Sequence, residues 1–473
     1  MTENTSQYHV ALFPFMSKGH TIPLLHLAHL LLRRGITVTI FTTPANKPFM
    51  ASYLADETTA SLIVLPFPQN VPNIPTGIES TDKLPSMSLF PSFALATKLM
   101  QPDFEQALGN LRPVSFMVSD GFLWWTLESA NKFGFPRLVS YGMSNYSICL
   151  TRAVRDEGLL SRAESDDEQI TVARYPWIKI TRNDFEPSII EDEQKGNQIE
   201  HMMKVVAASK SSYGYVVNSF YELEPVFVDY FNRQSEAKAW CVGPLCLAKL
   251  PKVVLKSSSH HQKPIWIKWL DEKLEQEKPV LYVAFGSQAE ITPDQLKEIA
   301  IGLEKSDVNF LWVTRNKESD LGDGFEERVK DRGTIVRDWV DQMEILEHRS
   351  VQGFLSHCGW NSVLESICAG VPILAWPMMA EQPLNAKMVA EEIKIGIRLG
   401  TRMGTERQLV KGERLEKKVR ELMWGNKGKE VAKRVKEYAE TARTAMAEGT
   451  GSSWRTLDML INEICRKQQQ EVK

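Results

Sequence analysis

Two residues in the amino-terminal part of the chain have side chains suited to proton transfer. His20 closes the loop MSKGH after an apolar segment, and Asp120 ends a second apolar segment. Histidine is the usual general base near neutral pH, and a neighbouring carboxylate can fix its tautomer and stabilise the imidazolium. The two positions predict a base and its partner at one edge of a sheet, although a histidine at a helix start is also a common structural residue.

A second set of residues, in the carboxy-terminal part of the chain, is suited to binding a nucleotide. An apolar segment ends at a histidine, a Cys-Gly-Trp turn follows, and Asn-Ser opens a helix. A strand, a glycine turn and a helix N-terminus form an anion site, because backbone N–H groups and the helix dipole point there. A glutamate one turn later can accept ribose hydroxyls, and a preceding tryptophan offers a flat face for a base. Taken singly, these residues are equally well explained as helix caps and core. They are Trp339, His357, Gly359, Trp360, Asn361, Ser362 and Glu365.

The elements that must position these residues alternate between strand-like and helix-like segments. Such alternation predicts parallel sheets with right-handed crossovers, in which ligands bind beyond the carboxyl ends of the strands. The expected fold class is therefore α/β, with two doubly wound Rossmann-like domains facing across a cleft. The predicted strands are 8–15, 36–43, 113–120, 136–141, 213–220, 279–287, 309–315, 351–357 and 372–377, and the predicted helices are 21–33, 292–306 and 361–370.

The expected domains are residues 1–242 and 264–473, joined by a linker over 243–263 that contains the run SSSHHQ. Residues 152–212 are polar, and we expect surface loops and short helices there. The last predicted helix, 452–467, could pack on either domain, including back on the amino-terminal one.

Composition narrows the function classes. The 473 residues are 43% hydrophobic and 24% charged with a net charge of −3, which does not favour binding to nucleic acid or an acidic membrane. The six cysteines include no C-x-x-C pair, and the nine histidines have no metal-ligand spacing. We find no signal peptide or membrane-spanning segment, so we expect a cytoplasmic protein without stable membrane insertion.

The 44 residues from Trp339 to Gln382 resemble the secondary-product box of plant family-one UDP-glycosyltransferases. The box begins with Trp, ends with Gln and contains HCGWNS, LES and AGVP. The similarity extends over essentially the whole chain, from the amino-terminal GH to the carboxy-terminal GSSWRTLDMLI. It implies the two-Rossmann (GT-B) glycosyltransferase fold, with the acceptor bound by the amino-terminal domain and the UDP-sugar by the carboxy-terminal domain.

The resemblance also implies roles for individual residues. It makes His20 the base and Asp120 its orienting partner. Uracil would stack on a tryptophan, the diphosphate would meet the serine, histidine and asparagine side chains, and the glutamate of the LES motif would hold the ribose. Glu381 and Gln382 would hold the sugar, and a terminal glutamine resembles the glucose-using members. The donor-binding residues so implied are Ser287, Trp339, Val340, Gln342, His357, Gly359, Trp360, Asn361, Ser362, Glu365, Glu381 and Gln382.

The chain departs from the family pattern at three places. Val340-Asp341 replaces the usual Ala-Pro, Glu381 stands where Asp is commoner, and Gly142 lies where some members have a sugar-contacting threonine. Donor binding survives the first change if the contact at position 340 is through the backbone.

The expected reaction is inverting transfer of glucose from UDP-glucose to a hydroxyl of a small lipophilic acceptor, giving a β-glucoside. A flavonoid or other phenol is favoured, and transfer to nitrogen or carbon stays open. We expect a monomer that needs no metal or other cofactor, UDP-glucose being a co-substrate. The alternatives are a catalytically inactive UDP-sugar-binding protein and a nicotinamide-dependent oxidoreductase, although no G-x-G-x-x-G follows a strand. The expected acceptor residues are Gly19, Phe90, Phe122, Trp124, Tyr141, Met143, Met202 and Ala380.

Overall fold

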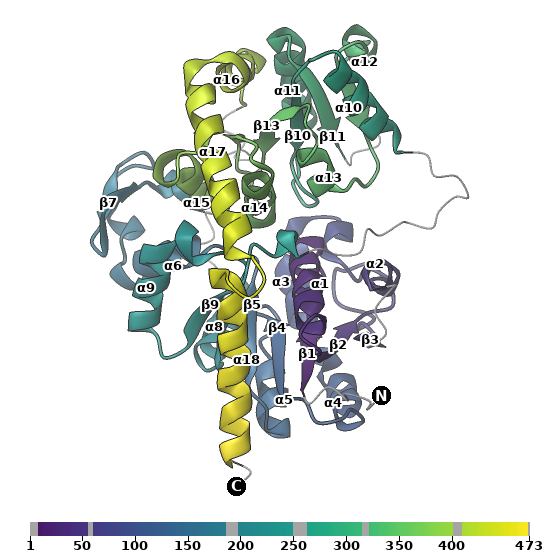
Figure 1. Ribbon diagram of the computed structural model, residues 1–473, viewed down its shortest axis with the longest axis vertical. Coiled ribbons are helices and arrows are strands. Elements are labelled where there is room, and N and C mark those ends of the chain that lie inside the picture. Colours follow the sequence, from purple (N-terminus) through teal and green to yellow (C-terminus); the bar gives the residue numbers. More distant parts are fainter. Residues whose placement is uncertain are drawn as a thin grey trace. The chain divides into compact units, whose positions relative to one another are not determined.

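The computed structural model describes residues 8–54, 60–185, 197–248, 263–314, 321–400 and 409–471. The chain divides into two compact units, each built around one large parallel sheet (Figure 1). The first unit contains Met1–Asn145, Glu193–Ser257 and Thr444–Lys473, and the second contains Tyr146–Asp192 and Ser258–Arg443. Most of the predicted linker, residues 249–262, lies outside the described residues.

The first unit holds a seven-stranded sheet in which every neighbouring pair of strands is parallel. Its strand order is β3-β2-β1-β4-β5-β8-β9. The strands are β1 His9–Phe13, β2 Thr37–Thr42, β3 Ala60–Val64, β4 Phe116–Asp120, β5 Arg137–Tyr141, β8 Gly214–Val217 and β9 Lys238–Cys241. The helices are α1 Lys18–Leu32, α2 Lys47–Tyr53, α3 Phe90–Ala96, α4 Gln101–Gly109, α5 Thr126–Phe133, α8 Asn197–Lys210, α9 Pro225–Gln234 and α18 Ser452–Glu471.

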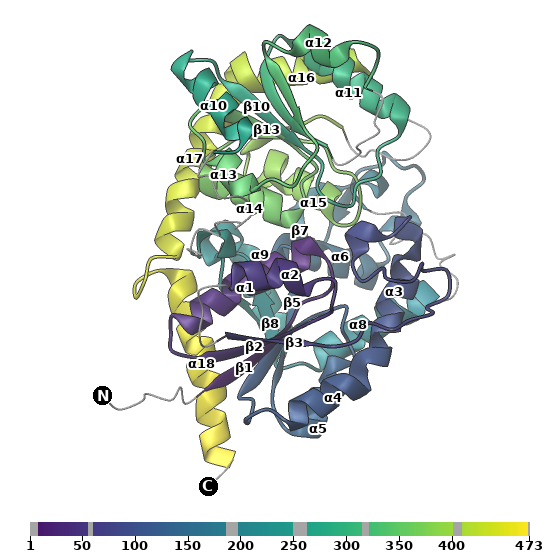
Figure 2. The same ribbon diagram turned by 90° about the vertical axis from the view of Figure 1, so that its right-hand side faces the viewer.

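The central strand β1 is buried on both faces, which explains its continuous apolar sequence HVALF. Because side chains alternate along a strand, Val10 and Leu12 join a core with helices α1 and α18, whereas Ala11 and Phe13 join a core with helices α3, α4 and α5. Figure 2 shows α1 and α18 apart from α4 and α5, on the other side of this sheet. The strand predictions for this half are confirmed; the edge strands β3 and β9 were not predicted.

The carboxy-terminal helix α18 packs on the sheet of the first unit, beside β9 (Figure 1). Its apolar residues Leu457, Leu460 and Ile464 are buried in the core shared with α1. Asp458 Oδ1 accepts a hydrogen bond of 2.6 Å from Arg34 Nε, just after the end of α1. The structure therefore resolves which unit the last helix joins.

The second unit holds a six-stranded parallel sheet of order β12-β11-β10-β13-β14-β15. Alternate residues of β10 enter two different cores, as in the first unit. The strands are β10 Val280–Ala284, β11 Asn309–Val313, β12 Gly333–Val336, β13 Val351–Ser356, β14 Ile373–Ala375 and β15 Gly396–Arg398. The helices are α10 Ile265–Glu275, α11 Pro293–Ser306, α12 Phe325–Val329, α13 Gln342–Leu346, α14 Trp360–Ala369, α15 Gln382–Lys387, α16 Gly412–Trp424 and α17 Asn426–Ala445.

Residues Tyr146–Asp192 depart from the predicted domain boundary, because they group with the second unit although they precede residue 242. They contain most of α6 (Asn145–Glu157) and an antiparallel hairpin of β6 (Ile170–Val172) and β7 (Tyr175–Ile180). The buried carboxylate of Asp184 receives Arg398 Nη2 at 2.9 Å and lies 3.8 Å from Lys387 Nζ, which ties this segment to β15 and α15. The expectation of loops and short helices over 152–212 also missed this hairpin and the 14-residue helix α8.

Among the described residues, no helix combines the length and apolar character needed to cross a bilayer.

Candidate active site

The predicted site residues lie where each sheet reverses its strand order. In the first sheet β1 lies between β2 and β4, and in the second sheet β10 lies between β11 and β13. At such a point the loops leave neighbouring strands in opposite directions, and ligands bind beyond the carboxyl ends. His20 follows β1 and Asp120 ends β4, whereas Ser287 follows β10 and His357 follows β13.

His20 and Asp120, 100 residues apart in the chain, are in direct contact. His20 Nδ1 lies 2.6 Å from Asp120 Oδ2, and the other carboxylate oxygen accepts a 2.9 Å hydrogen bond from the backbone N–H of Phe122. The side chain of Asp120 is 2% exposed and that of His20 is 20% exposed. With Nδ1 donating to the carboxylate, Nε2 is the nitrogen that can take a proton from a substrate.

His20 lies in the first turn of α1 and not in the loop that we predicted. The helix begins at Lys18, directly after Ser17, whose backbone is extended with φ −144° and ψ 136°. The expected start at residue 21 was three residues late, because helix termini have weak sequence signals when no side chain caps them. The correction leaves His20 at the same edge of the sheet.

Two aromatic rings lie next to the His20 imidazole. The ring centroids of Phe122 and Phe15 lie 5.4 Å and 6.0 Å from that of His20. The Phe90 ring adds a further layer, 5.1 Å from Phe122 and 5.7 Å from Phe15. The predicted acceptor residues Phe90 and Phe122 thus form one apolar surface beside His20, and together with Phe15 we call it the aromatic wall.

His201 on α8 joins this wall, and sequence reasoning missed it. Its ring lies 6.0 Å from Phe122 and 6.5 Å from Phe90, and burial lowers its pKa. Met202, which we predicted instead, is 49% exposed on another face of the helix. The available signal was the spacing His201, Val205, Ser209, which places one buried residue on every turn of a helix.

Tyr141 and Trp124, two other predicted acceptor residues, contact polar or charged side chains. Tyr141 donates or accepts a 2.6 Å hydrogen bond with Ser209 Oγ, and burial raises its pKa, so its hydroxyl is already engaged in packing. The Trp124 ring has Lys98 Nζ at 4.7 Å and Lys204 Nζ at 5.0 Å from its centroid.

Three further acceptor predictions fall on loops or helix ends. Gly19 lies in the first turn of α1. Met143 is half-buried and follows Gly142, where an added Cβ would lie 3.6 Å from His20 Nε2. Ala380 belongs to the second unit and adopts φ +53°. A side chain at position 142 would therefore be in van der Waals contact with the His20 ring, and glycine leaves that place unfilled.

In the second unit the His357 imidazole lies between two glycines from different loops. A Cβ on Gly286 or on Gly359 would lie 2.6 Å from His357 Nε2 in either case. Gly286 also has φ +76°, which favours glycine. Both glycines are thus required for the ring to occupy this place. Burial lowers the pKa of His357 to about 4, so the ring is neutral near pH 7.

The helix α14 begins at Trp360, one residue earlier than predicted, with Gly359 as its N-cap. Glycine brings no side chain to cap the helix, so the backbone N–H groups of the first turn are not bonded by a capping side chain and suit phosphate oxygens. Asn361 and Ser362 lie in this first turn. Trp360 itself is buried at 2% exposure, whereas Asn361 and Ser287 are half-buried.

A hydrogen-bonded network links Gln342 to the first turns of α14. Its Nε2 donates to Ser362 Oγ at 2.8 Å and to Glu365 Oε2 at 2.6 Å, and its Oε1 accepts from the Tyr282 hydroxyl at 3.2 Å. Burial raises the pKa of Glu365 to about 7, with the nearby charge of Asp341 acting in the same direction. A ribose that donates hydroxyl hydrogens would stabilise the ionised form of Glu365.

The departure Val340-Asp341 has a structural explanation. Val340 is buried in the core of the second sheet, and the Asp341 carboxylate caps α13 by accepting from the backbone N–H groups of Met343 at 3.0 Å and Glu344 at 3.2 Å. Trp339, directly before them, is 46% exposed, as expected of a side chain that offers its face to a ligand.

At the end of the 44-residue box, near Gln382, side chains form hydrogen bonds with backbone groups. Gln382 Oε1 accepts from the N–H groups of Met378 and Met379, each at 3.0 Å, which orients its amide nitrogen. Asn385, which we did not predict, is fully buried and donates to the Cys358 carbonyl at 3.0 Å and to Glu381 Oε1 at 3.4 Å. Asn385 therefore joins the turn after β13 to the start of α15.

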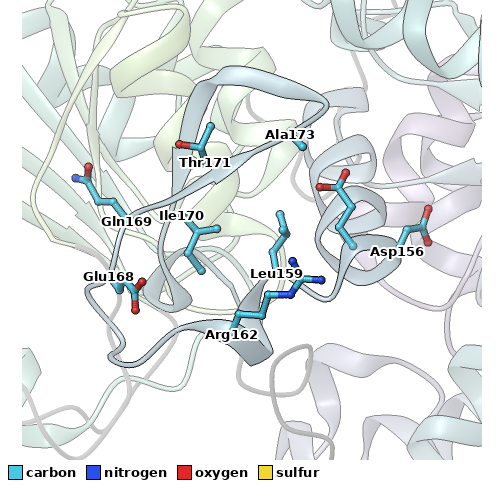
Figure 3. Close-up of a pocket in the computed structure, with 9 residues that line it drawn as sticks. Asp156, Leu159, Arg162, Glu168, Gln169, Ile170, Thr171 and Ala173 are labelled. Carbon is cyan, nitrogen blue, oxygen red and sulfur yellow. The ribbon is translucent and has the colours of Figure 1, made fainter.

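A cavity of about 680 Å³ lies elsewhere in the second unit and contains none of the predicted site residues (Figure 3). Two of its carboxylates are already paired, since Arg174 lies 3.3 Å from Asp156 and 2.9 Å from Glu157. In the described ranges no group of three or more potential metal ligands was found. The cavity is lined by Asp156, Glu157, Leu159, Arg162, Glu168, Gln169, Ile170, Thr171 and Ala173.

Comparison with known proteins gives consistent matches over the chain. Residues 251–423 match the family described as UDP-glucoronosyl and UDP-glucosyl transferase. The chain is 55% identical to UDP-glycosyltransferase 90A1 of Arabidopsis thaliana over 98% of both proteins. It is 36% identical to UDP-glucose flavonoid 3-O-glucosyltransferase 7 of Fragaria ananassa, covering 98% of this chain and 97% of that protein.

Among solved structures, the fold is similar to that of Medicago truncatula UGT71G1 complexed with UDP-glucose. The TM-score is 0.81 at 27% sequence identity, and the match covers 98% of this chain and all of the other.

Proposed function

The chain belongs to the plant family-one UDP-glycosyltransferases and is a glycosyltransferase of GT-B fold, and from this premise we propose that it transfers glucose from UDP-glucose to a hydroxyl of a small planar acceptor with inversion. The product of such a transfer is a β-glucoside, because the sugar is α-linked in the donor. The named activities of the relatives favour an enzyme, so we set aside the inactive sugar-binding alternative.

The observation that carries the proposal is the 2.6 Å contact between His20 Nδ1 and Asp120 Oδ2. Asp120 holds the imidazole in the tautomer whose Nε2 accepts a proton, and its charge stabilises the imidazolium as that proton arrives. The acceptor oxygen, losing its proton to Nε2, attacks the anomeric carbon as the bond from that carbon to UDP breaks. A single displacement of this kind inverts the configuration.

The donor side has to stabilise the leaving diphosphate. Its charge would be met by the N-terminal N–H groups of α14 and by Ser362, beside a neutral His357 that adds hydrogen-bonding capacity without charge. Trp339 would stack on uracil, and Glu365 would accept the ribose hydroxyls. These roles are supported by the positions of the residues around one strand end and one helix start.

Glucose as the transferred sugar is supported by the orientation of Gln382. Two backbone N–H groups occupy its Oε1, so its Nε2 is the atom that can donate to a sugar hydroxyl, with Glu381 next to it as an acceptor. A solved structure with a similar fold binds UDP-glucose, which agrees with this assignment.

The aromatic wall supports a planar acceptor. Rings at Phe15, Phe90 and Phe122 beside the base offer flat apolar faces on which a phenol can stack with its hydroxyl towards His20. One relative is named as a flavonoid 3-O-glucosyltransferase. We therefore propose a flavonoid or another phenol as the acceptor class.

The proposal assigns no metal or redox cofactor, because protein N–H donors stabilise the diphosphate. Dialysis of the enzyme against EDTA should therefore leave its rate unchanged. Loss of activity that Mg²⁺ restores would contradict this part of the proposal.

The test is a mass-spectrometric screen of the purified protein with UDP-glucose and a panel of flavonoids, simple phenols, terpenoids and hormones. We expect products carrying one hexose on the phenolic members and none with the His20→Ala variant. NMR of the product should show a β-anomeric linkage. Hexose transfer by His20→Ala at the wild-type rate, or an α-linked product, would refute the mechanism.

A further inference from the structure

A buried arginine lies directly beneath the His20–Asp120 pair. Arg137 is the first residue of β5 and is 1% exposed. Its Nε donates to Ser119 Oγ at 2.7 Å and Thr126 Oγ1 at 3.0 Å, its Nη1 to Ser212 Oγ at 2.9 Å, and its Nη2 to the backbone carbonyl of Asp120 at 3.1 Å. Among the described residues, no carboxylate forms an ion pair with this guanidinium.

Asp120 carries the opposite charge and is also buried. Its carboxylate is buried and receives hydrogen bonds from His20 Nδ1 and from the Phe122 N–H, and within the described part of the chain it has no Lys or Arg ion pair. Two opposite charges are therefore buried on neighbouring strands, β4 and β5, without direct contact. They are linked through the backbone carbonyl of Asp120 itself. A buried charge without a counter-charge is energetically unfavourable, so each of these two charges stabilises the other.

We propose that Arg137 is a positioning residue for catalysis, which acts through Asp120 as its buried counter-charge and holds His20 in the neutral form that accepts a proton. This inference rests on the proposed role of His20 as the base. The hydrogen bond to the Asp120 carbonyl fixes the end of β4, and the positive charge of Arg137 opposes a second positive charge on the nearby imidazole.

The charge of Arg137 persists under the conditions of catalysis. Burial lowers its pKa to about 10, which still leaves it protonated near pH 7. The titratable groups that interact with it are Asp120 on β4, Tyr141 on its own strand and Tyr215 on β8. Because burial raises the pKa of Tyr141, that hydroxyl stays neutral.

Several of the remaining charged groups on the surrounding helices have partners of their own, whereas Lys210 at the end of α8 is exposed. On α8, Lys204 pairs with Glu200 and burial lowers the pKa of His201; on α5, Glu128 pairs with Lys98 and Lys132 with Glu105; on α1, Lys18 lies over the Phe49 ring.

A neutral residue at position 137 should make His20 easier to protonate. In Arg137→Gln the acid limb of the kcat/KM pH profile moves to higher pH, so activity at pH 6 falls about three- to tenfold further than activity at pH 8. Arg137→Lys keeps the charge and should keep the wild-type ratio of the two activities. A purely structural role would lower activity equally at both pH values.

Ser212→Asp provides a second variant in which the arginine remains. Ser212 Oγ accepts from Arg137 Nη1, so a carboxylate at this position neutralises the guanidinium in place. It should move the acid limb in the same direction as Arg137→Gln. The matched control is Arg332→Gln in the second unit, because Arg332 Nη1 donates to the carbonyls of Leu303 and Val308 and its loss should lower stability without moving the pH profile.

The experiment measures kcat/KM from pH 5.5 to 9 for the four variants, with the melting temperature and the Kd for UDP-glucose of each. The inference is supported if Arg137→Gln and Ser212→Asp lower the pH 6 to pH 8 activity ratio while Arg137→Lys and Arg332→Gln do not. It is overturned if the ratio is unchanged in both neutralising variants, or if Arg137→Lys changes it as much as Arg137→Gln. If Arg137→Gln does not fold, an unchanged ratio in Ser212→Asp overturns it. Wild-type activity of His20→Ala would instead refute the proposed base.

Discussion

The two parallel sheets place chemistry at the same topological position but by different means. At the carboxyl edge of the first sheet, β1 and β4 bring together an imidazole and a buried carboxylate from positions 100 residues apart. At the carboxyl edge of the second sheet, β10 and β13 bring together two glycine turns that enclose the neutral ring of His357. In the function that we propose, the first edge transfers a proton and the second edge binds an anion.

The difference shows that the strand order determines where a ligand can bind, whereas the side chains at that edge determine the chemistry. His20 contacts the Asp120 carboxylate and is 20% exposed, which suits the role of base that we propose for it. His357 is packed between backbones, and its pKa of about 4 removes it from proton transfer near pH 7. Mutation of His20 is therefore expected to lower turnover, whereas displacement of His357 is expected to weaken donor binding.

The largest expected effect is on turnover at the first edge. His20→Ala should lower kcat/KM by about 10²–10⁴-fold, because the acceptor loses its base, while the Kd for UDP-glucose stays unchanged. His26→Ala is a matched control on the same helix, since burial lowers the pKa of His26 to about 4 and it makes no bond to Asp120 in the structure. Comparable losses in both variants would contradict the distinction between a base and a structural histidine.

The next effect concerns donor binding at the second edge. In Gly286→Ala the new Cβ would lie 2.6 Å from His357 Nε2, so the imidazole has to move and the Kd for UDP should rise about tenfold or more. Gly370→Ala has a similar φ, +72°, at the other end of α14 and its nearest neighbour is the flexible Lys436 at 3.5 Å. It should cost a similar backbone strain, about 1–2 kcal/mol for a left-handed residue. Calorimetric titration with UDP separates the two, and equal affinities would show that the His357 position is unimportant.

A smaller expected effect is a pH dependence of UDP binding at the second edge. The pKa of Glu365 is raised to about 7 by burial, and only the carboxylate can accept both ribose hydroxyls. Affinity for UDP should therefore rise with pH, by about tenfold between pH 6 and pH 8, as the group ionises through this range. Glu365→Gln should bind UDP weakly and with no such pH dependence. A wild-type Kd that is constant over this range would rule out Glu365 as the titrating ligand.

The smallest effect tests the unusual Asp341. Asp341→Ala removes the cap of α13 and should lower the free energy of unfolding by about 1 kcal/mol, whereas Asp341→Asn retains a capping side chain and most of that stability. Burial is the main cause of the raised pKa of Glu365, and both substitutions remove the smaller contribution of the Asp341 charge, so both should shift the pH midpoint of UDP binding slightly downwards. Thermal unfolding and UDP titrations measure the two effects separately. A midpoint that moves only in the alanine variant would assign the shift to the lost cap.

Much of the architecture and the two strand-end sites could be predicted from the sequence. Apolar runs such as HVALF and VLYVA are buried on both faces of their sheets, so they carry a local signal that requires no knowledge of distant contacts. The turn from His357 to Trp360 is also local, because a strand, a glycine and a helix start follow one another directly in the chain.

Other features depended on contacts between distant segments. The sequence left the position of α18 open, and it assigned Tyr146–Asp192 to the first domain, because neither segment contains a local mark of the sheet on which it packs. His201 was missed although the spacing of buried residues on its helix gave a local signal, whereas Asn385 and Arg137 were missed because no local signal marks them. Each of the latter two is an ordinary polar residue in its own stretch of sequence and becomes significant only through neighbours on other elements.

The sequence by itself thus determined the central strands and several helices, and it predicted which strand ends carry candidate site residues, since apolar periodicity and glycine turns act over a few residues. The tertiary structure alone decided that the buried guanidinium of Arg137 donates to the backbone carbonyl of Asp120, next to the His20–Asp120 pair that the sequence had predicted. The order of strands in a sheet is fixed by packing of the whole unit, and so the partners of a buried charge are not encoded in its neighbours along the chain.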